Sequence, residues 1–325
     1  MQRGFPLHLL SLVCCPEDGH DLQASSHQAF IIRGVVTCAG CQRSYPIEDG
    51  ILSLLGTELH PESHKEMRTR DVRNEQIRSR QRSEWQSAHA DAVEVRPTLM
   101  ALDVEQGSIV AELGCGTGRY TVDIASRASA TVAVDLSHSG LLVLRQKLAL
   151  SAPVALVQAD VTKPYGSRCG FDRVLSTLHS NLPTREHREA ALRHAASALN
   201  DRGKAVISMH HRNVPDAVRG IEVSGRYPDS GIYRYYMTKA EARREAARFF
   251  DRVRFVYLSA DLPRVSVAAI SLLAARVPLV RDGLARLFLA VGEAPRRANS
   301  EPGFRSVRPE SVASVMTPRS GGRVV

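Results

Sequence analysis

The sequence predicts an α/β fold in which a largely parallel sheet carries helices on both faces, with a small β module in front of it. Three observations predict it: an apolar run that ends in a glycine-rich loop, three further apolar runs that lead into polar residues, and four cysteines within the first 41 residues. The chain has 325 residues, 43% of them hydrophobic, and can therefore bury a large core. We expect one large domain and one small accessory module.

Two cysteine-containing turns near the N-terminus have the spacing of a metal site. Cys38 and Cys41 form a CxxC pair, which can place two thiolates on one tetrahedral zinc ion. About twenty residues earlier lies Cys15, and Asp18 stands where the second cysteine of a matching pair would be. We expect a cytoplasmic chain, in which clustered cysteines bind metal more often than they form disulfides. The predicted zinc ligands are Cys15, Asp18, Cys38 and Cys41, with Cys14 and His20 as nearby substitutes.

Short strand-like segments lie between and after these turns. Residues 30–32 and 35–37 flank Gly34, and the run Tyr45-Pro46-Ile47-Glu48-Asp49-Gly50-Ile51 follows the second turn. Residues 9–56 resemble the small zinc-ribbon family that is often found beside or fused to methyltransferases. The resemblance implies one structural zinc, which would stabilise the fold and perform no chemistry. Because Asp18 departs from the family's cysteine, a metal-free ribbon is the alternative, and a redox or chance cysteine pair is a third.

Residues 57–100 are polar and read as a helical linker or lid. Between Met67 and Trp85 there is no glycine or proline, which favours a helix. Its apolar positions are sparse, so we expect a connector or lid and not a core helix. Trp85 is the only tryptophan and is expected either to anchor this helix or to cover a ligand.

The strongest signal lies in the middle of the chain. The buried-strand run Ile109–Leu113 leads into Gly114-Cys115-Gly116-Thr117-Gly118, and a helical pattern follows over 119–127. A strand, a glycine-rich turn and a helix in this order indicate nucleotide binding, because glycines let the backbone approach the ligand. The spacing is GxGxG, which differs from the GxGxxG of NAD-binding domains, the structural rival.

Acidic side chains stand where a nucleoside would need them. Glu112 lies at the end of the first strand, and Asp135 ends the second, where it can accept ribose hydroxyls. Asp160 follows the third strand, 154–158, in a position to bond an exocyclic amine. A fourth run spans 171–176 and a fifth 204–209, with a helix from Thr184 to Leu199 between them.

This ordered set resembles the class I S-adenosylmethionine-dependent methyltransferases. The resemblance covers about residues 78–292 and implies a Rossmann-like seven-stranded sheet, with the sixth and seventh strands at 252–258 and 287–292 and the last one antiparallel. It implies S-adenosylmethionine as cofactor, within a domain at 101–294 that follows the ribbon at 1–56 and precedes a disordered tail at 295–325. The implied cofactor-binding residues are Glu112, Gly114, Cys115, Gly116, Thr117, Gly118, Asp135, Leu136, Asp160, Val161 and Ser176.

Acceptor residues should follow the strand ends. His179 follows the fourth strand and is the first candidate for a catalytic base or substrate contact, while His210, after the fifth, is a weaker one. A structural role that caps the loop is the alternative for His179.

Two further features could belong to the acceptor site. A tyrosine group formed by Tyr227, Tyr233, Tyr235 and Tyr236 could line a pocket or serve only packing. The apolar segment 259–284 could shape the acceptor pocket, pack in the core, or touch a membrane surface or a partner.

Charge decides between the classes of acceptor. The net charge of +9 suggests nucleic acid, but it is spread over the C-terminal two thirds, and the ribbon is net acidic. We therefore expect transfer to an oxygen or nitrogen of a small molecule, a metabolite or natural product. The alternatives are a ribosomal-RNA or tRNA methyltransferase that docks RNA through the ribbon, and a non-catalytic regulator or scaffold. We expect no membrane span, and the sequence leaves the oligomeric state open.

Overall fold

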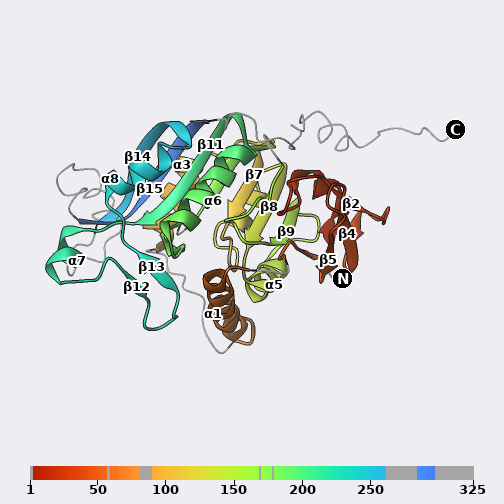
Figure 1. Cartoon of the computed structure of the whole chain (residues 1–325), viewed down its shortest axis with the longest axis horizontal. Coiled ribbons are helices and arrows are strands. Elements are labelled where there is room, and N and C mark those ends of the chain that lie inside the picture. Colours follow the sequence, from red (N-terminus) through yellow and green to blue (C-terminus); the bar gives the residue numbers. More distant parts are fainter. Residues whose placement is uncertain are drawn as a thin grey trace.

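A computed structural model describes residues 3–56, 59–80, 90–167, 170–177, 179–260 and 284–296. Its main sheet has eleven strands in the order β14-β15-β11-β10-β7-β8-β9-β6-β5-β4-β2 (Figure 1). The seven from β14 to β9 are those expected for the large domain. Their bounds are β7 Ile109–Leu113, β8 Ala130–Asp135, β9 Val154–Gln158, β10 Phe171–Ser176, β11 Leu199–His210, β14 Phe250–Ala260 and β15 Ala285–Pro295.

The strand directions match the sequence prediction. β7 to β11 are mutually parallel, and β15 runs antiparallel to both β11 and β14. Every residue of β7, β8 and β9 is buried. These strands need apolar residues on both sides because helices cover both faces of a parallel sheet. The predicted seven-stranded arrangement with an antiparallel last strand is therefore confirmed.

Two sets of helices sandwich this sheet. α3 (Arg96–Leu102), α4 (Thr121–Ala125) and α5 (His138–Lys147) pack on one face. α6 (Arg185–Ala198) and α8 (Lys239–Ala246) pack on the other. The first turns of α5, α6 and α8 are capped by Ser137, Thr184 and Thr238, whose hydroxyls accept hydrogen bonds from backbone N–H groups. The helix expected over 119–127 is shorter than predicted, since only 121–125 is helical.

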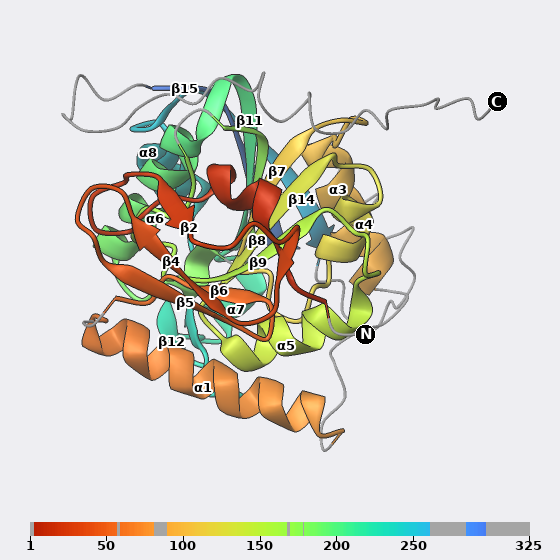
Figure 2. The same cartoon turned by 90° about the vertical axis from the view of Figure 1, so that its right-hand side faces the viewer.

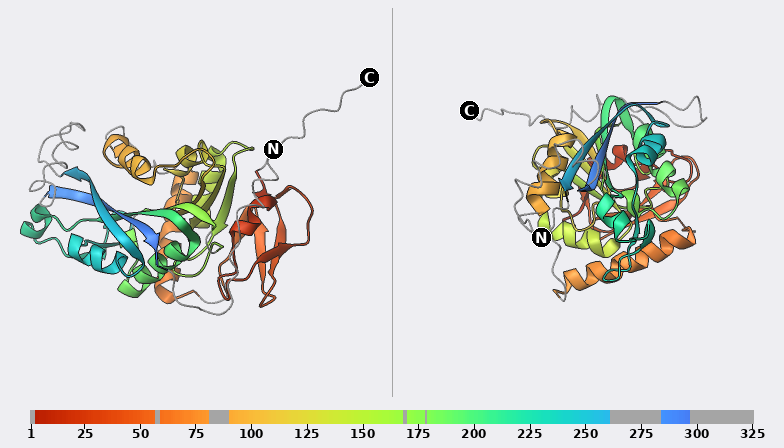
Figure 3. Two further views of the ribbon diagram at one scale, coloured as in Figure 1. Left: turned by 90° about the horizontal axis from the view of Figure 1, so that it is seen from above. Right: turned by 90° about the vertical axis from the view of Figure 1, so that its left-hand side faces the viewer.

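The N-terminal module continues the main sheet. Its strand β6 (Ile51–Ser53) pairs in parallel with β9, and β5 (Ser44–Glu48), β4 (Gly34–Cys38) and β2 (Leu22–Ala24) follow outward. A separate pair is formed by β1 (Phe5–Pro6) and β3 (Phe30–Ile31). Figures 1 and 3 show the module at one end of the sheet, with β14 and β15 at the other. The strands predicted at 30–32 and 35–37 therefore exist as β3 and β4. β4 lies in the main sheet, which β2, β4, β5 and β6 extend from seven strands to eleven, while β3 lies in the separate pair.

The module also covers one face of the large domain. Its 3-10 helix η1 (Leu7–Leu12) buries Leu9, Leu10 and Leu12 in the same core as β8 and β9. No helix connects β9 to β10 within the described residues, so η1 occupies the side that such a helix would cover. The buried Arg3 side chain donates to the carbonyls of Ala149, Leu150, Ala152 and Val154, just before and at β9.

The linker forms a helix, as expected, with different bounds. α1 runs from Pro61 to Arg78, where the sequence suggested 67–85. It lies along α5 (Figure 2), and the Asp71 carboxylate accepts from the Ser137 hydroxyl at 2.8 Å and from the Ser139 N–H at 3.1 Å. The hydroxyl of Ser137 also accepts from Asn74 at 3.0 Å. α1 is therefore attached to the beginning of α5, directly beside the end of β8.

Smaller elements complete the described chain. They are the π-helix η2 (Asp91–Val95), the 3-10 helix η3 (His179–Asn181), α7 (Val214–Val218), and the hairpin of β12 (Ser224–Arg226) and β13 (Tyr233–Tyr235). Trp85, Cys169, most of the segment 259–284 and the chain from 297 onward lie outside the described residues. Among the helices that are described, none is both long enough and apolar enough to cross a bilayer.

Candidate active site

Two adjoining cavities lie at the carboxyl ends of the central strands. Both are lined by Arg70, Gly114, Asp135 and Thr177, so they meet at the glycine loop. The first cavity extends along the loop towards η2 and α4, and the second extends past the ends of β9 and β10 towards η3 and α6. Open α/β sheets bind their ligands at this edge.

The glycines of the loop are required for two different reasons. Gly114 and Gly116 have φ values of +75° and +54°, a left-handed conformation that side chains rarely adopt. A Cβ on Gly116 would meet nothing within 4 Å, so it would occupy open space at the cavity. Gly118 instead lies against the core, since its Cβ would stand 2.2 Å from Leu144 Cδ1. Of the predicted loop, Gly114, Cys115, Gly116 and Thr117 line the first cavity, and Gly118 lines neither.

Asp135 connects the loop to the second strand. Its Oδ2 accepts the Gly116 N–H at 2.8 Å, and its Oδ1 accepts the Ser137 N–H at 2.8 Å. Burial raises the pKa of this carboxyl, which the charge of Arg70 and the two N–H donors oppose. Each carboxylate oxygen has a second lone pair, so Asp135 can still accept from a ligand.

Glu112 is buried beneath the loop and lines neither cavity. Burial raises its pKa to about 8, and the nearby charge of Asp135 adds to the effect. The Thr121 side chain partly opposes this rise, but neither carboxylate oxygen has a partner within full hydrogen-bond distance among the residues described. The geometry therefore sets Glu112 behind the site and does not place it beside the other predicted cofactor residues.

The end of β9 forms one wall of the second cavity. Asp160 orients its carboxylate by accepting the Thr162 N–H at 2.9 Å and the Thr162 hydroxyl at 2.7 Å. Leu136 and Val161 line the same cavity, and so does Ser176 from the end of β10. These predicted residues are thus brought together by three different strands.

α1 forms the opposite wall of both cavities. Arg70, Arg73, Asn74 and Ile77 line the first one, while Ser63, Glu66 and Arg70 line the second. The sequence predicted a linker or lid helix here but did not predict which of its residues line the cavities. α1 has no apolar stripe, so its sequence does not show which side faces the protein. The first cavity also receives Glu94 and Arg119, whose side chains form an ion pair at 3.1 Å.

The structure separates the two candidate histidines. His179 is buried, lines the second cavity, and has no hydrogen-bond partner for either ring nitrogen among the residues described. Burial, together with the charge of Arg188, lowers its pKa to about 3, so the ring is neutral at pH 7. His210 lines neither cavity, and its ring nitrogens contact Ser180 Oγ and Tyr227 Oη, each at 2.9 Å. The geometry favours His179 as the residue that meets a substrate.

The tyrosine group packs away from these cavities. None of its four members is among the residues that line either cavity. The rings of Tyr227 and Tyr236 lie edge-on to His210, and the Arg188 guanidinium lies 4.4 Å from the ring centroid of Tyr235. Packing is thus the role that the geometry gives to these three.

The four predicted zinc ligands lie together. The ligand atoms of Cys15, Asp18, Cys38 and Cys41 are all within 4.8 Å of one another. The Cys15 and Cys41 sulfurs are 3.7 Å apart, and the Cys38 sulfur lies 3.3 Å from Asp18 Oδ1. Tetrahedral zinc, with Zn–S near 2.3 Å and Zn–O near 2.1 Å, places its ligand atoms roughly 3.5–3.8 Å apart. The cluster therefore fits a zinc ion.

The substitutes considered for this cluster lie outside it. The Cys14 thiol donates to the Gly166 carbonyl at 3.3 Å, and burial raises its pKa to about 12. His20 Nδ1 contacts Asp18 Oδ2 at 3.3 Å and so orients that carboxylate. Cys115, in the glycine loop, is buried, and burial raises its pKa well above the ordinary value, so the thiol is protonated at pH 7.

Comparisons with known proteins agree with this architecture. Residues 110–203 match the family model of the methyltransferase domain, and residues 7–50 match that of the Trm112p-like proteins. A curated relative, ribosomal RNA small subunit methyltransferase A of Moorella thermoacetica, is 33% identical over 107 residues, which are 32% of this chain. The chain matches only about a third (35%) of the length of that relative.

Solved structures are similar to this chain at low sequence identity. One from the DhpI-SAM-HEP complex has a TM-score of 0.50 and 16% identity, and the match covers 72% of this chain and 99% of that one. Another belongs to a complex between the Haloferax volcanii Trm112 methyltransferase activator and a methyltransferase, with a TM-score of 0.49, 19% identity, and coverage of 73% and 99%. By these family matches, the chain joins an N-terminal Trm112p-like module to a methyltransferase domain.

Proposed function

We propose that this protein transfers the methyl group of S-adenosylmethionine to an oxygen or nitrogen atom of a small molecule. The observation that carries the proposal is the position of α1, which lines both cavities opposite the strand ends. An acceptor has to enter a pocket that is bounded on one side by α1. A small metabolite fits such a pocket better than the extended surface of a nucleic acid does. The absence of a concentrated basic stripe in the sequence supports the same choice.

The residues around the cavities fit the cofactor. Asp135 would accept the ribose hydroxyls and Asp160 the exocyclic amine, while Leu136 and Val161 offer apolar surface to a base. Arg70, Arg73, Glu94 and Arg119 surround the first cavity with both signs of charge, which suits the amino and carboxylate groups of a methionyl end. When bound, the cofactor supplies an electrophilic methyl group on a positively charged sulfur.

The protein's own contribution to the reaction is placement. Methyl transfer is an in-line displacement, and holding two reactants in line can supply roughly 7–11 kcal/mol of the barrier. His179 is neutral at pH 7, so one of its ring nitrogens can accept a hydrogen bond from the attacking hydroxyl or amine and orient its lone pair. The lowered pKa makes the ring a weak base, so its role is to position the acceptor and not to remove its proton. His210 would act indirectly, by holding Ser180 in the 3-10 turn that carries His179.

We also propose one structural zinc in the module. Cys15, Cys38, Cys41 and Asp18 supply four ligands and close the coordination sphere, so the ion would stabilise folding and leave no open position for chemistry.

Calorimetry with adenosylhomocysteine tests the cofactor assignment. Asp135→Ala should weaken binding at least about tenfold, because a ribose contact to a carboxylate contributes on the order of 1.5–3 kcal/mol. Glu222→Ala, which removes an exposed carboxylate outside both cavities, should leave affinity unchanged. Equal affinity of the wild type and Asp135→Ala would contradict the assignment.

The second candidate function is methylation of RNA. The likeness to a ribosomal RNA methyltransferase over 107 residues favours it. Incubation with radioactive S-adenosylmethionine and separate RNA and metabolite fractions distinguishes the two, since label in RNA alone would replace our first choice. A cofactor-binding regulator, the third possibility, would bind adenosylhomocysteine and label neither fraction.

A further inference from the structure

We propose that Glu66, Asn181 and His179 form an acceptor-binding site in the second cavity, and that this site takes a molecule with two or more hydroxyl or amino groups. The inference rests on the proposed methyl transfer and adds the chemical class of the acceptor. Neither Glu66 nor Asn181 was a candidate in the sequence, where one lies in the linker and the other in a loop.

The position of these residues separates them from the cofactor contacts. The strand ends of β7, β8 and β9 supply the glycine loop, Asp135 and Asp160. Glu66 comes from α1, and His179 and Asn181 come from η3, which follows β10. All three line the same cavity as the cofactor residues, so a molecule held by them would lie beside the cofactor.

Each of the three residues presents buried polar atoms that make no hydrogen bond to the described residues. Glu66 is 4% exposed and Asn181 5% exposed, and the atoms without a hydrogen-bond partner are Glu66 Oε2, Asn181 Oδ1 and both ring nitrogens of His179. A buried polar atom left without a partner costs roughly 1–3 kcal/mol. Three such residues in one cavity therefore point to a ligand that satisfies them.

The chemistry of these atoms defines the ligand. A carboxylate oxygen and an amide oxygen only accept hydrogen bonds, while a neutral imidazole has one acceptor and one donor nitrogen. The site thus offers three acceptors against one donor, and the ligand has to present mainly donors. Hydroxyl and amino groups are such donors, and they also carry the lone pair that attacks a methyl group.

Local charge argues for a neutral ligand. Glu66 Oε1 accepts from the Arg226 guanidinium at 2.6 Å, and the Arg70 guanidinium lies 3.9 Å from Glu66 Oε2. Two arginines therefore balance the carboxylate, and a permanent cation is not required. Arg226 belongs to the β12–β13 hairpin, so this ion pair also fixes the position of the α1 wall against that hairpin.

Ligand-observed NMR on the full-length protein saturated with adenosylhomocysteine tests the proposal. The probes are 2-aminophenol and catechol, which carry two donors, against 2-methoxy-N,N-dimethylaniline and 1,2-dimethoxybenzene, in which methylation removes both donors. We expect the first probe of each pair to bind at least about tenfold more tightly, as the loss of a hydrogen bond to a charged acceptor predicts. Equal binding of the matched probes, or no binding of any of them, would overturn the proposal.

Variants assign the preference to these residues. Glu66→Gln and Asn181→Leu should each reduce the preference for the donor-bearing probe over its methylated counterpart about tenfold. Asn181→Asp keeps the side-chain oxygen and should retain this preference. Glu62→Gln is the matched control, because Glu62 lies on the same helix, contacts the same Arg226 at 3.5 Å, and lines neither cavity. A preference that persists in Glu66→Gln and Asn181→Leu would also overturn the proposal. Calorimetry with adenosylhomocysteine is run on every protein, since failure of the wild type to bind it would refute the proposed function itself.

Discussion

Leu52 of the N-terminal module pairs with Val157 of the methyltransferase sheet, in parallel and with both side chains buried. This register makes the module and the large domain share one sheet and one core. It also covers the edge of β9. An exposed strand edge is a common site of unwanted association between chains.

The shared core predicts a single unfolding transition. Leu52 is fully buried, so Leu52→Ala should cost roughly 2–5 kcal/mol and lower the stability of the whole chain. Urea unfolding followed by circular dichroism, with thermal unfolding in parallel, measures this. Val35→Ala, at a module residue that is 50% exposed, should change little. Two separate transitions, with only the smaller one affected by Leu52→Ala, would mean that the module folds on its own.

The metal site predicts one zinc per chain in purified protein, measured by mass spectrometry of the metal. Cys41→Ser should lose the zinc and lower the melting temperature, because zinc binding contributes directly to folding. Cys14→Ser, which alters a neighbouring thiol outside the cluster, should keep the metal. Wild-type protein that is folded and free of zinc would identify the module as a metal-free ribbon.

The raised pKa of Glu112 predicts a pH effect on the cofactor-free protein. Its pKa lies at about 8 in the folded state against an ordinary value of 4.5, so the folded state binds the proton more tightly than the unfolded state. Stability should therefore fall as the pH rises from 4.5 to 8, by at most roughly 5 kcal/mol from this group. The glutamine of Glu112→Gln is neutral at every pH, so the free energy of unfolding of this variant should fall less between pH 5 and pH 8. Urea unfolding at these two pH values measures it. Parallel curves for wild type and variant would refute the effect, and Glu222→Gln should follow the wild type.

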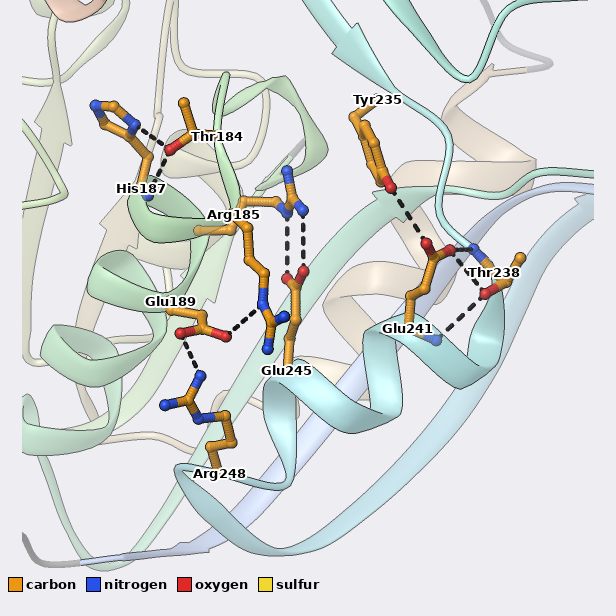
Figure 4. Close-up of polar contacts among 10 residues, drawn as sticks. Thr184, Arg185, His187, Glu189, Tyr235, Thr238, Glu241, Glu245 and Arg248 are labelled. Atoms are coloured by element: carbon orange, nitrogen blue, oxygen red, sulfur yellow. Dashed lines mark hydrogen bonds and ion pairs between the residues drawn. The ribbon is translucent and has the colours of Figure 1, made fainter.

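A buried ion pair joins α6 to α8. The Arg188 guanidinium donates to both carboxylate oxygens of Glu245, at 2.9 and 3.1 Å, and both residues are buried. The two dashed lines at Glu245 in Figure 4 are these contacts. Glu245→Ala would leave the arginine unpaired and should cost roughly 3–5 kcal/mol in urea unfolding. The double variant Arg188→Met with Glu245→Leu should recover most of this loss, since no buried charge remains. A loss as large in the double variant as in the single one would contradict this account.

An exposed ion pair nearby supplies the comparison. Arg185 contacts Glu189 at 2.8 Å on the surface of α6 (Figure 4), where water and salt screen the interaction. Arg185→Ala should therefore leave the stability of the protein nearly unchanged.

Local sequence determined the glycine loop, the acidic strand ends, the seven central strands and the four clustered ligands of the module. Each of these depends on a short pattern: a positive φ that requires glycine, a buried run that requires apolar residues on both faces, or a turn that brings two thiolates together. Such patterns act over a few residues and can be recognised without knowledge of the remaining chain.

Only the tertiary structure decided how these parts meet. The pairing of β6 with β9 joins residues about a hundred positions apart, and neither strand carries a sequence signal for its neighbour. The same holds for α1, whose polar residues gave no hint of the side that lines the cavities, and for His179 and His210, which both follow strands. Burial and hydrogen-bond partners separate the two histidines, and these depend on long-range packing that a linear pattern does not encode.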